Sequence, residues 1–315
     1  MNTKSSYQYI FGPVPSRRLG FSLGIDIIPH KTCTLDCVYC ECGKTTHLTC
    51  KRSHYIQSEL VIEELNNYLE TDPPHIDYIT FSGSGEPTLN DHIDDIVDFI
   101  KSNYSQYSLA LLTNTTLFSN RKLWEQIKNI DVVIASLDAG NESIFKKINR
   151  PHPQIHYQEM VDGLIEFRNQ VHKQLWIEYF VVPELNDTEE DMLQFREITQ
   201  RIHPDKIQLN SLDRPGTESW VQPVSKEKLA YLARYLDQAE VIHEFKAPDF
   251  QNSVIQPYTN RILSLLERRP CTLEDISASL HISLDQVKEY LHDMIQHRII
   301  ETKDMSRGIF YFVNK

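Results

Sequence analysis

Long apolar runs are missing from this 315-residue chain, and its basic residues are outnumbered by acidic ones. No apolar run approaches the roughly 20 residues that a membrane-spanning helix needs, and the opening stretch MNTKSSYQYIFG lacks the apolar segment of a signal peptide. We therefore expect a cytoplasmic protein without a membrane partner. The net charge of −12 argues against binding of a phosphate backbone by the whole surface, although it allows a local basic groove.

Cysteine is also scarce, except in one segment. The chain has 6 cysteines, and four of them lie between positions 33 and 42. In a reducing cytosol, clustered cysteines are more often metal ligands or redox groups than structural disulfides. Cys33, Cys37 and Cys40 form a C-x3-C-x2-C pattern, which we therefore treat as the first candidate site.

This cysteine pattern has three chemical interpretations. Zinc would need a fourth ligand, which a neighbouring cysteine or His47 could supply. A thioredoxin-like redox pair would use Cys37 and Cys40 and would leave Cys33 idle. A [4Fe–4S] cluster normally takes four thiolates, so three would leave one iron open to an exogenous ligand and make a catalytic centre. The spacing alone does not choose among them.

Secondary-structure patterns before residue 250 alternate between strand and helix, after an irregular opening. The predicted strands cover residues 22–29, 76–83, 108–114, 131–138, 175–182 and 205–212. Between them lie stretches with helical spacing of apolar residues, such as HIDDIVDFIKSNY. This alternation predicts an α/β fold with a parallel sheet and six βα units, fewer than the eight of a complete barrel. A partial barrel and a doubly wound sheet both satisfy the pattern.

The character of the sequence changes near residues 244–257. Residues 258–315 predict three helices and two short strands, the pattern of a winged-helix domain, with Thr272 as an N-cap and Asp275 three residues later. This segment holds eight Lys or Arg and eight Asp or Glu residues, which disfavours DNA binding and favours docking of a substrate or a partner. We therefore expect two domains, residues 1–250 and 258–315.

With Tyr39 before its third cysteine, the pattern resembles the signature of the radical S-adenosylmethionine (SAM) superfamily. In that superfamily the three cysteines hold a [4Fe–4S] cluster, and the methionyl amine and carboxylate of SAM chelate the fourth iron. The resemblance implies that Cys33, Cys37 and Cys40 bind the cluster and that Tyr39 belongs to the SAM site. It also implies that the sheet is a partial (β/α)6 TIM-like barrel.

The segment TFSGSGEPTL resembles the glycine–glycine–glutamate element of the same superfamily. Gly83 and Gly85 would let the backbone approach SAM closely, and Glu86 would accept a hydrogen bond from its ammonium group. Ser84 replaces the more usual glycine, and Pro87 fixes the turn after the strand. An ordinary glycine turn is the alternative.

Polar residues at two later strand ends extend the resemblance. LLTNTTL resembles a Thr-Asn-Gly element, which places Thr113 and Asn114 in the SAM site, with Thr115 where the glycine would be. In IASLDAGNES, Ser136 and Asp138 are the candidates for binding the ribose of SAM, with helix capping as the alternative. Since such strand ends face one mouth of a parallel barrel, these residues are expected to meet there.

A narrower resemblance joins FGPVPSRRLGFSLGID, DCVYCECGKT, SGEPTL, IQLNSLDRPG and the winged-helix tail. Together they resemble the wyosine-synthetase-like subgroup, named after the enzyme that builds a tricyclic base on transfer RNA. The further cysteines that a second cluster would need in that enzyme are not evident here. The resemblance is therefore to the subgroup, and it does not carry over the transfer-RNA reaction.

Candidate substrate residues lie at two places. Arg17 and Arg18 follow GPVPS, and Arg214 follows the sixth predicted strand, beside Asn210 and Asp213. Planar guanidinium groups suit a phosphate or a carboxylate. The alternative is that these arginines pair with structural acids and lock the N-terminal segment over the barrel.

The function implied by the resemblance is a radical reaction on a substrate that the sequence does not identify. A low-potential donor of the flavodoxin or ferredoxin type would supply an electron, and SAM would be cleaved to a 5′-deoxyadenosyl radical. The substrate would be an RNA base, a polypeptide or a partner enzyme. An iron–sulfur or zinc-binding regulator that acts through the winged-helix domain is the alternative.

Overall fold

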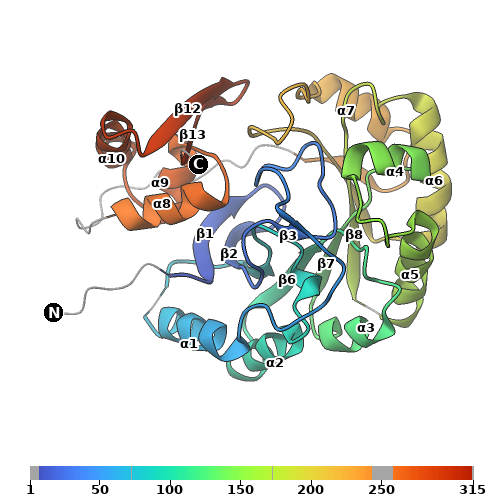
Figure 1. The fold of residues 1–315 in the computed structure, drawn as a ribbon, viewed down its shortest axis with the longest axis horizontal. Coiled ribbons are helices and arrows are strands. Elements are labelled where there is room, and N and C mark those ends of the chain that lie inside the picture. The colour runs from blue at the N-terminus through green and yellow to red at the C-terminus, as the bar shows by residue number, and fades with distance from the viewer. Residues whose placement is uncertain (1–6, 72, 172, 243–257, 314–315) are drawn as a thin grey trace.

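An eight-stranded sheet forms the centre of the computed structural model, which describes residues 7–71, 73–171, 173–242 and 258–313 (Figure 1). The strand order is β1-β2-β5-β6-β7-β8-β9-β10. β1 pairs with β2 in the antiparallel sense, and every later neighbour is parallel. The strands are β1 Ile10–Ser16, β2 Gly20–Ile25, β5 Tyr78–Phe81, β6 Ser108–Thr113, β7 Val132–Ser136, β8 Gln174–Phe180, β9 Lys206–Asn210 and β10 Ala239–Val241.

The parallel strands form because their sequences are apolar on both faces. β7 reads VVIAS and buries its first four residues, as expected for a strand covered on two sides. The intervening helices pack one apolar stripe against the sheet; the second helix buries Ile93, Ile96, Val97 and Ile100 at helical spacing. These helices are α1 Ser58–Leu69, α2 Ile93–Asn103, α3 Arg121–Ile127, α4 Glu142–Asn149, α5 Tyr157–Gln170, α6 Glu189–Ile202 and α7 Lys226–Ala233.

The predicted α/β architecture with a mostly parallel sheet is confirmed. Each of β2, β5, β6, β7, β8 and β9 is followed by a helix, which gives the six expected βα units of a partial barrel. The opening segment, predicted to be irregular, is instead the edge strand β1, which tolerates Pro13 and Pro15 because an edge strand leaves backbone positions unpaired. β10 adds a short parallel strand at the other edge.

The C-terminal part contains the three predicted helices and two predicted strands, with one additional short strand. Thr272 caps α9 in a capping box with Asp275, as its spacing predicts. The small sheet has the order β11-β13-β12. The elements are α8 Thr259–Arg268, β11 Cys271–Thr272, α9 Leu273–Leu280, α10 Leu284–Gln296, β12 Ile300–Met305 and β13 Gly308–Val313. The predicted boundary at residues 244–257 lies outside the described residues.

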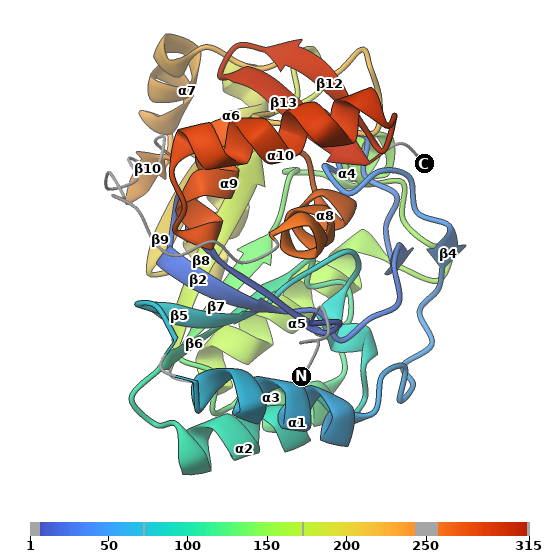
Figure 2. The ribbon, with the colours of Figure 1, turned by 90° about the vertical axis from the view of Figure 1, so that its left-hand side faces the viewer.

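β1 connects the two parts of the chain. Its Val14 is buried in the same hydrophobic cluster as Ile262 of α8, Ile276 of α9 and Leu291 of α10. Helices α8–α10 and helices α1–α3 therefore lie on opposite sides of β1 and β2 (Figures 1 and 2). The unexpected strand is thus the surface on which the C-terminal elements pack.

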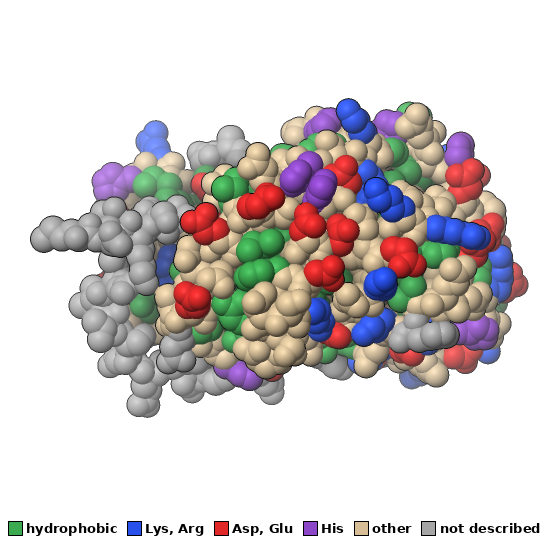
Figure 3. All heavy atoms as spheres, turned by 90° about the horizontal axis from the view of Figure 1, so that it is seen from below, with side chains coloured by type: hydrophobic (Ala, Val, Ile, Leu, Met, Phe, Trp, Pro, Cys, Tyr) green, Lys and Arg blue, Asp and Glu red, His purple; other side chains and the backbone are tan. Residues whose placement is uncertain are grey.

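Two properties of the whole chain bear on its environment. Within the described ranges, no helix is both long enough and apolar enough to cross a membrane. On the face shown in Figure 3, Asp and Glu side chains lie among Lys and Arg side chains. This face is therefore a mixed charged surface. Together with the net charge of −12, it does not favour binding of a polyanion such as a nucleic-acid backbone.

Candidate active site

The cysteine loop, residues 31–50, joins β2 to α1 and contains the short parallel pair β3 Thr32–Cys33 and β4 His47–Leu48. Cys33, Cys37 and Cys40 are free thiols at intermediate exposure. Each of their sulfurs accepts a hydrogen bond from a different nitrogen donor. The three contacts are Lys31 Nζ to Cys40 Sγ at 3.1 Å, Asn114 Nδ2 to Cys33 Sγ at 3.5 Å and Asn149 Nδ2 to Cys37 Sγ at 3.4 Å.

The protonation of the three thiols differs. Burial, followed by the charge of Glu86, raises the pKa of Cys33 to about 12. Burial also raises the pKa of Cys37 well above its ordinary value. A hydrogen bond from Cys42 and the charge of Lys31 outweigh burial and lower the pKa of Cys40 to about 6. Metal binding would therefore displace protons from Cys33 and Cys37, as is usual for thiolate ligands.

The three sulfurs offer the thiolate ligands that an iron–sulfur cluster takes. Among the described residues, no group of three His, Cys, Asp or Glu side chains is placed to hold one metal ion. In an iron–sulfur cluster each thiolate binds a separate iron, so the sulfurs need not converge on one point. Nitrogen donors on all three sulfurs also match the hydrogen bonding that stabilises cluster thiolates. The three cysteines therefore fit a [4Fe–4S] cluster.

The glycine loop, residues 83–86, lies directly against the start of the cysteine loop. The Lys31 amide donates to the carbonyl of Ser84 at 3.0 Å, and the Glu86 amide donates to the carbonyl of Thr32 at 3.1 Å. A Cβ atom on Gly85 would lie 2.1 Å from the Thr32 carbonyl oxygen, so only glycine permits this approach. The two loops that the sequence analysis assigned to the cluster and to SAM are therefore neighbours.

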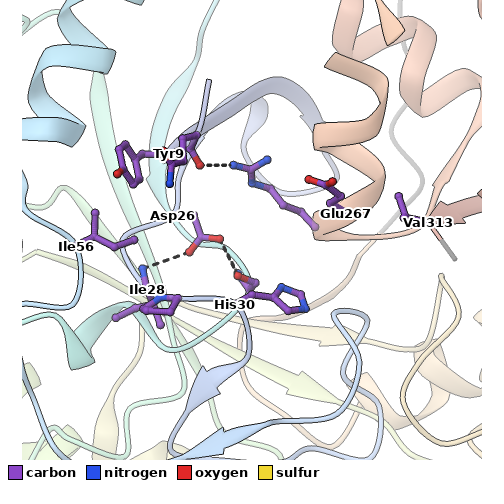
Figure 4. Close-up of a pocket in the computed structure, with 11 residues that line it drawn as sticks. Tyr9, Asp26, Ile28, His30, Ile56, Glu267 and Val313 are labelled. Atoms are coloured by element: carbon purple, nitrogen blue, oxygen red, sulfur yellow. Dashed lines mark hydrogen bonds between the residues drawn. The ribbon is translucent and has the colours of Figure 1, made fainter. Parts of the chain in front are cut away.

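Behind the glycine loop lies a cavity of about 460 Å³ between the barrel and α8 (Figure 4). Asp26 projects into it and accepts hydrogen bonds from the amide and the hydroxyl of Ser84, at 3.1 and 2.8 Å. A Cβ atom on Gly83 would lie 2.2 Å from the carboxyl carbon of Asp26. Ser84 and Gly83 thus fix the glycine loop against Asp26, a residue that the motif did not indicate.

Replacing Gly85 with alanine is expected to push the two loops apart. The added methyl group overlaps the Thr32 carbonyl, and overpacking of this kind costs about 1–3 kcal/mol of unfolding free energy. The measurements are urea unfolding and SAM affinity by calorimetry. Ser82→Ala is the control, because Ser82 precedes the glycine loop and the change adds no atom. Unchanged stability and unchanged SAM affinity for Gly85→Ala would contradict the assigned loop contact.

Glu86 is almost fully buried, and its carboxylate is already engaged. It accepts from the Thr88 amide at 3.1 Å, the Thr113 hydroxyl at 2.7 Å and the Asn114 amide at 2.8 Å. Burial raises its pKa, and these hydrogen bonds oppose the shift. Glu86 therefore ties the end of β5 to the end of β6, and Pro87 begins the short helix η1 (Pro87–Leu89) that follows. The predicted contact with an ammonium group would have to share these oxygens.

Asn114 connects the β6 end to the cysteine loop, because its Nδ2 also donates to the Thr34 hydroxyl at 2.8 Å. Thr115, which stands at the expected glycine, has a φ of 60°. This left-handed conformation is strained for a β-branched residue and explains why glycine is usual there. The Thr115 hydroxyl offsets part of the strain by donating to the carbonyl of Asn114 at 2.7 Å.

Asp138 positions aromatic and amide side chains around the cysteines. It accepts from the Tyr39 hydroxyl at 2.6 Å, from Asn149 Nδ2 at 2.7 Å and from the Phe180 amide at 3.0 Å. Burial raises the pKa of Asp138 to about 6. The Tyr39 ring stacks on the Phe180 ring with centroids 3.8 Å apart. Asp138 thus holds Tyr39 and the donor to Cys37, whereas Ser136 faces the neighbouring cavity.

We call this neighbouring cavity the barrel cavity. It has a volume of about 230 Å³, and most of the predicted substrate residues line it. Arg18 pairs with Glu178 at 2.7 Å, and Asn210 donates to the same carboxylate at 2.6 Å. The lining includes both of the adjacent cysteine-loop residues Cys40 and Glu41. The predicted residues in it are Arg17, Arg18, Tyr39, Cys40, Ser136, Asn210 and Arg214.

Arg214 and Asp213 lie where the barrel meets the C-terminal part. Arg214 Nη1 donates to the Pro270 carbonyl at 2.6 Å and pairs with Asp275 at 2.7 Å. Asp213 pairs with Arg307 at 3.0 Å and with Arg17 at 3.9 Å. This is the structural alternative considered from the sequence, in which the arginines pair with acids. Arg17 and Arg18 pair with acids of the barrel, whereas the acid nearest to Arg214, Asp275, comes from the C-terminal part, which the sequence did not indicate.

Several site residues have no motif of their own. Lys31 is buried beside Cys40, Asn149 is the last residue of α4, and Glu178 lies within β8. Lys31 could have been suggested by its position two residues before the first cysteine, but the others become neighbours of the site only through the fold. Arg269 also lines the barrel cavity, from the end of α8.

Replacing Lys31 with methionine is expected to lower the reduction potential of the cluster. The ammonium group 3.1 Å from Cys40 Sγ stabilises the more negative reduced state, and methionine removes both the charge and the hydrogen bond. A spectroscopic redox titration of the reconstituted protein measures the shift. Lys44→Met, in the same loop but exposed, is the matched control. Equal potentials for the Lys31 and Lys44 variants would contradict this role.

Comparisons with known proteins show the family of the chain. A family model described as the Radical SAM superfamily matches residues 27–196, more than half of the chain. A protein named "GTPase Obg" from Brachyspira hyodysenteriae is 32% identical over 316 residues, which cover 99% of this chain and 46% of that protein. The chain thus spans less than half the length of this relative.

Two solved structures share the fold. A radical SAM methyltransferase from Sphaerobacter thermophilus has a TM-score of 0.55 and 15% identity, covering 70% of this chain and 66% of that chain. TYW1 with a bound lysine–pyruvate adduct has a TM-score of 0.52 and 17% identity, covering 71% of this chain and 74% of that chain. At these identities the likeness concerns the fold alone.

Proposed function

This chain belongs to the radical SAM superfamily, and from that premise we propose that it is an enzyme whose reaction takes place in the barrel cavity beside Cys40. Proteins of the family use a [4Fe–4S] cluster and SAM. When bound, these cofactors supply a 5′-deoxyadenosyl radical that removes a hydrogen atom from the substrate. The observation that carries the proposal is the set of three cysteines, each with a nitrogen donor, packed against the glycine loop.

The protein itself would hold the cluster, orient SAM and the substrate, and shield them from water. Cys33, Cys37 and Cys40 would bind the cluster, and Asn149 and Lys31 would hold two of these thiolates by hydrogen bonds. Backbone groups of the glycine loop would receive the methionyl end of SAM. The residues proposed for SAM are Tyr39, Gly83, Ser84, Gly85, Glu86, Pro87, Thr113, Asn114, Ser136 and Asp138, of which Glu86 and Asp138 act mainly by positioning their neighbours.

For the C-terminal part we propose a winged-helix domain, residues 258–315, packed on a barrel of residues 1–250. Three helices, the three-stranded sheet β11-β13-β12 and a separate hydrophobic cluster support this division. It would dock the substrate or a partner, and a flavodoxin- or ferredoxin-type donor would supply the electron. The residues shared with the wyosine-synthetase-like subgroup support membership there, with an RNA base, a polypeptide or a partner enzyme as substrate.

Anaerobic reconstitution tests the proposed function. The purified protein is supplied with iron and sulfide, reduced, and mixed with SAM, and 5′-deoxyadenosine is measured by chromatography. We expect cluster absorption in the visible range and formation of 5′-deoxyadenosine. A protein that binds zinc instead, or that forms a cluster and leaves SAM intact, would refute the proposal.

A further inference from the structure

The barrel cavity is more basic than the rest of the protein. It is lined by four arginines, and its only carboxylates within the described residues are Glu41 and Glu178. The chain as a whole carries a net charge of −12. A local excess of guanidinium groups in an acidic protein therefore needs a specific explanation. The four arginines are Arg17, Arg18, Arg214 and Arg269.

Two of the four arginines are held by close carboxylates. Arg18 lies 2.7 Å from Glu178, and Arg214 lies 2.7 Å from Asp275. Such close pairs are largely neutralised and serve the packing of the barrel against the C-terminal part. They leave little positive charge for a ligand.

Arg17 is held more loosely. Its only described ion pair is with Asp213 at 3.9 Å, and Asp213 is closer to Arg307, at 3.0 Å. Because Arg307 already neutralises this carboxylate, the guanidinium of Arg17 keeps donors for another acceptor.

Arg269 has no close partner. Within residues 7–71, 73–171, 173–242 and 258–313, its side chain makes no hydrogen bond and no ion pair, although the charges of Asp275 and Glu41 act on it. Burial, followed by the like charge of Arg214, lowers its pKa more than Cys271, Asp275 and Glu41 raise it. An anion in the cavity would relieve this repulsion and supply the missing acceptor.

Arg269 also lines a second cavity. Together with Glu41 it lines both the barrel cavity and a second cavity of about 350 Å³ along the seam between the cysteine loop and the C-terminal part. In that second cavity Arg268 and Arg269 face the three acids Glu41, Glu267 and Glu301. The described lining of the second cavity therefore has no excess of positive charge. This disfavours binding of a nucleic-acid backbone along the seam.

We propose that Arg269 and Arg17 form an anion subsite that binds a single oxyanion of the substrate, a carboxylate or a phosphate, inside the barrel cavity. The proposal rests on the proposed function, since it takes the barrel cavity as the place of reaction. It assigns to the C-terminal part a direct role in recognising the substrate, through the residue that ends α8.

The test uses the reconstituted holoenzyme saturated with SAM, so that any site for the carboxylate of SAM is already filled. Inorganic phosphate and acetate are titrated separately by calorimetry. Saturable binding of either is expected, and tighter binding of phosphate or of acetate identifies the kind of oxyanion. Arg269→Gln is expected to weaken this binding at least tenfold, or by about 1.4 kcal/mol.

Three comparisons make the result specific. Arg234→Gln, an exposed arginine on the barrel, is the control and should bind as the unaltered protein does. Arg269→Lys, which keeps the charge and loses the planar fork, should fall between the two. If Arg269→Gln is poorly folded by circular dichroism, the lysine variant alone decides, and binding equal to that of the unaltered protein overturns the subsite.

The remaining outcomes separate this inference from the proposed function. No saturable binding, or equal binding by the Arg269→Gln and unaltered proteins, overturns the anion subsite. Binding that is present only without SAM also overturns it. Cleavage of SAM by the unaltered holoenzyme is measured in parallel: cleavage without anion binding refutes only the subsite, whereas anion binding without cleavage refutes only the proposed function.

Discussion

Replacing Cys37 with alanine is expected to prevent cluster assembly and to abolish cleavage of SAM. Cys37 accepts from Asn149, which Asp138 holds in place, so the sulfur sits in a site built around it. Loss of an outer partner of a metal ligand typically costs 10–100-fold in affinity or activity, and loss of the ligand itself should exceed about 100-fold. Iron and sulfide content, visible absorption and 5′-deoxyadenosine formation measure the effect.

The matched control is Cys50→Ala. Cys50 is a free thiol at the end of the same loop, and burial alone raises its pKa, with no contribution from Cys33, Cys37 or Cys40. We expect this variant to keep its cluster, with at most a modest change in activity. A Cys37→Ala protein that retains the cluster, or a Cys50→Ala protein that loses it, would show that the ligands have been assigned wrongly.

Replacing Asp275 with asparagine is expected to lower the unfolding free energy by about 3–5 kcal/mol. The carboxylate accepts from Arg214 at 2.7 Å, from Arg307 and from the Thr272 amide at 3.2 Å. Asparagine removes the carboxylate charge shared by two mostly buried guanidinium groups, which then keep as acidic partners, among the described residues, only Glu41 at 3.5 Å from Arg214 and Asp213 at 3.0 Å from Arg307. Urea unfolding of the full chain measures the loss.

Asp285→Asn is the control for this substitution. Asp285 is also in the C-terminal part, but its side chain is 90% exposed and pairs only with Lys288 among the described residues. Exposed pairs contribute little, so a change within about 0.5 kcal/mol is expected. Equal destabilisation by the two variants would mean that the Asp275 network does not hold the two parts of the chain together.

The Asp275 network also predicts an acid dependence. Burial acts to raise the pKa of Asp275, but Arg214, Arg307 and Arg269 outweigh it and lower the pKa below its ordinary value. The unfolded chain then binds the proton more readily than the folded one. The stability from Asp275 is therefore present at neutral pH and is lost as the pH falls below about 4. Unfolding curves of Asp275→Asn should lack this part of the acid dependence.

The sequence predicted the strand ends well because those residues obey local rules. Apolar runs place β5 to β9, and cysteine and glycine spacing places the two loops that meet at Thr32. The contacts of Glu86 and Asp138 could not be predicted in this way. Both carboxylates accept from groups far along the chain, such as Asn114 and Phe180, and only the fold brings these together.

β1 and Arg269 escaped prediction for a different reason. β1 contains two prolines, which obscure a strand pattern, and it forms because β2 and the C-terminal helices cover it. Arg269 lies in a run of basic residues at the end of a helix, where arginine ordinarily faces solvent. Its position in the barrel cavity depends on how α8 packs on β1, which no local pattern encodes.

The packing of α8–α10 on β1 has a consequence for shortened forms of the chain. Val14 would become an apolar surface residue, Arg214 would lose Asp275, and the barrel cavity would lose Arg269 from its lining. In a protein cut after residue 242, the barrel cavity would be more exposed to solvent. We expect that a radical formed there would react with solvent before it reached the substrate, even with all three cysteines in place.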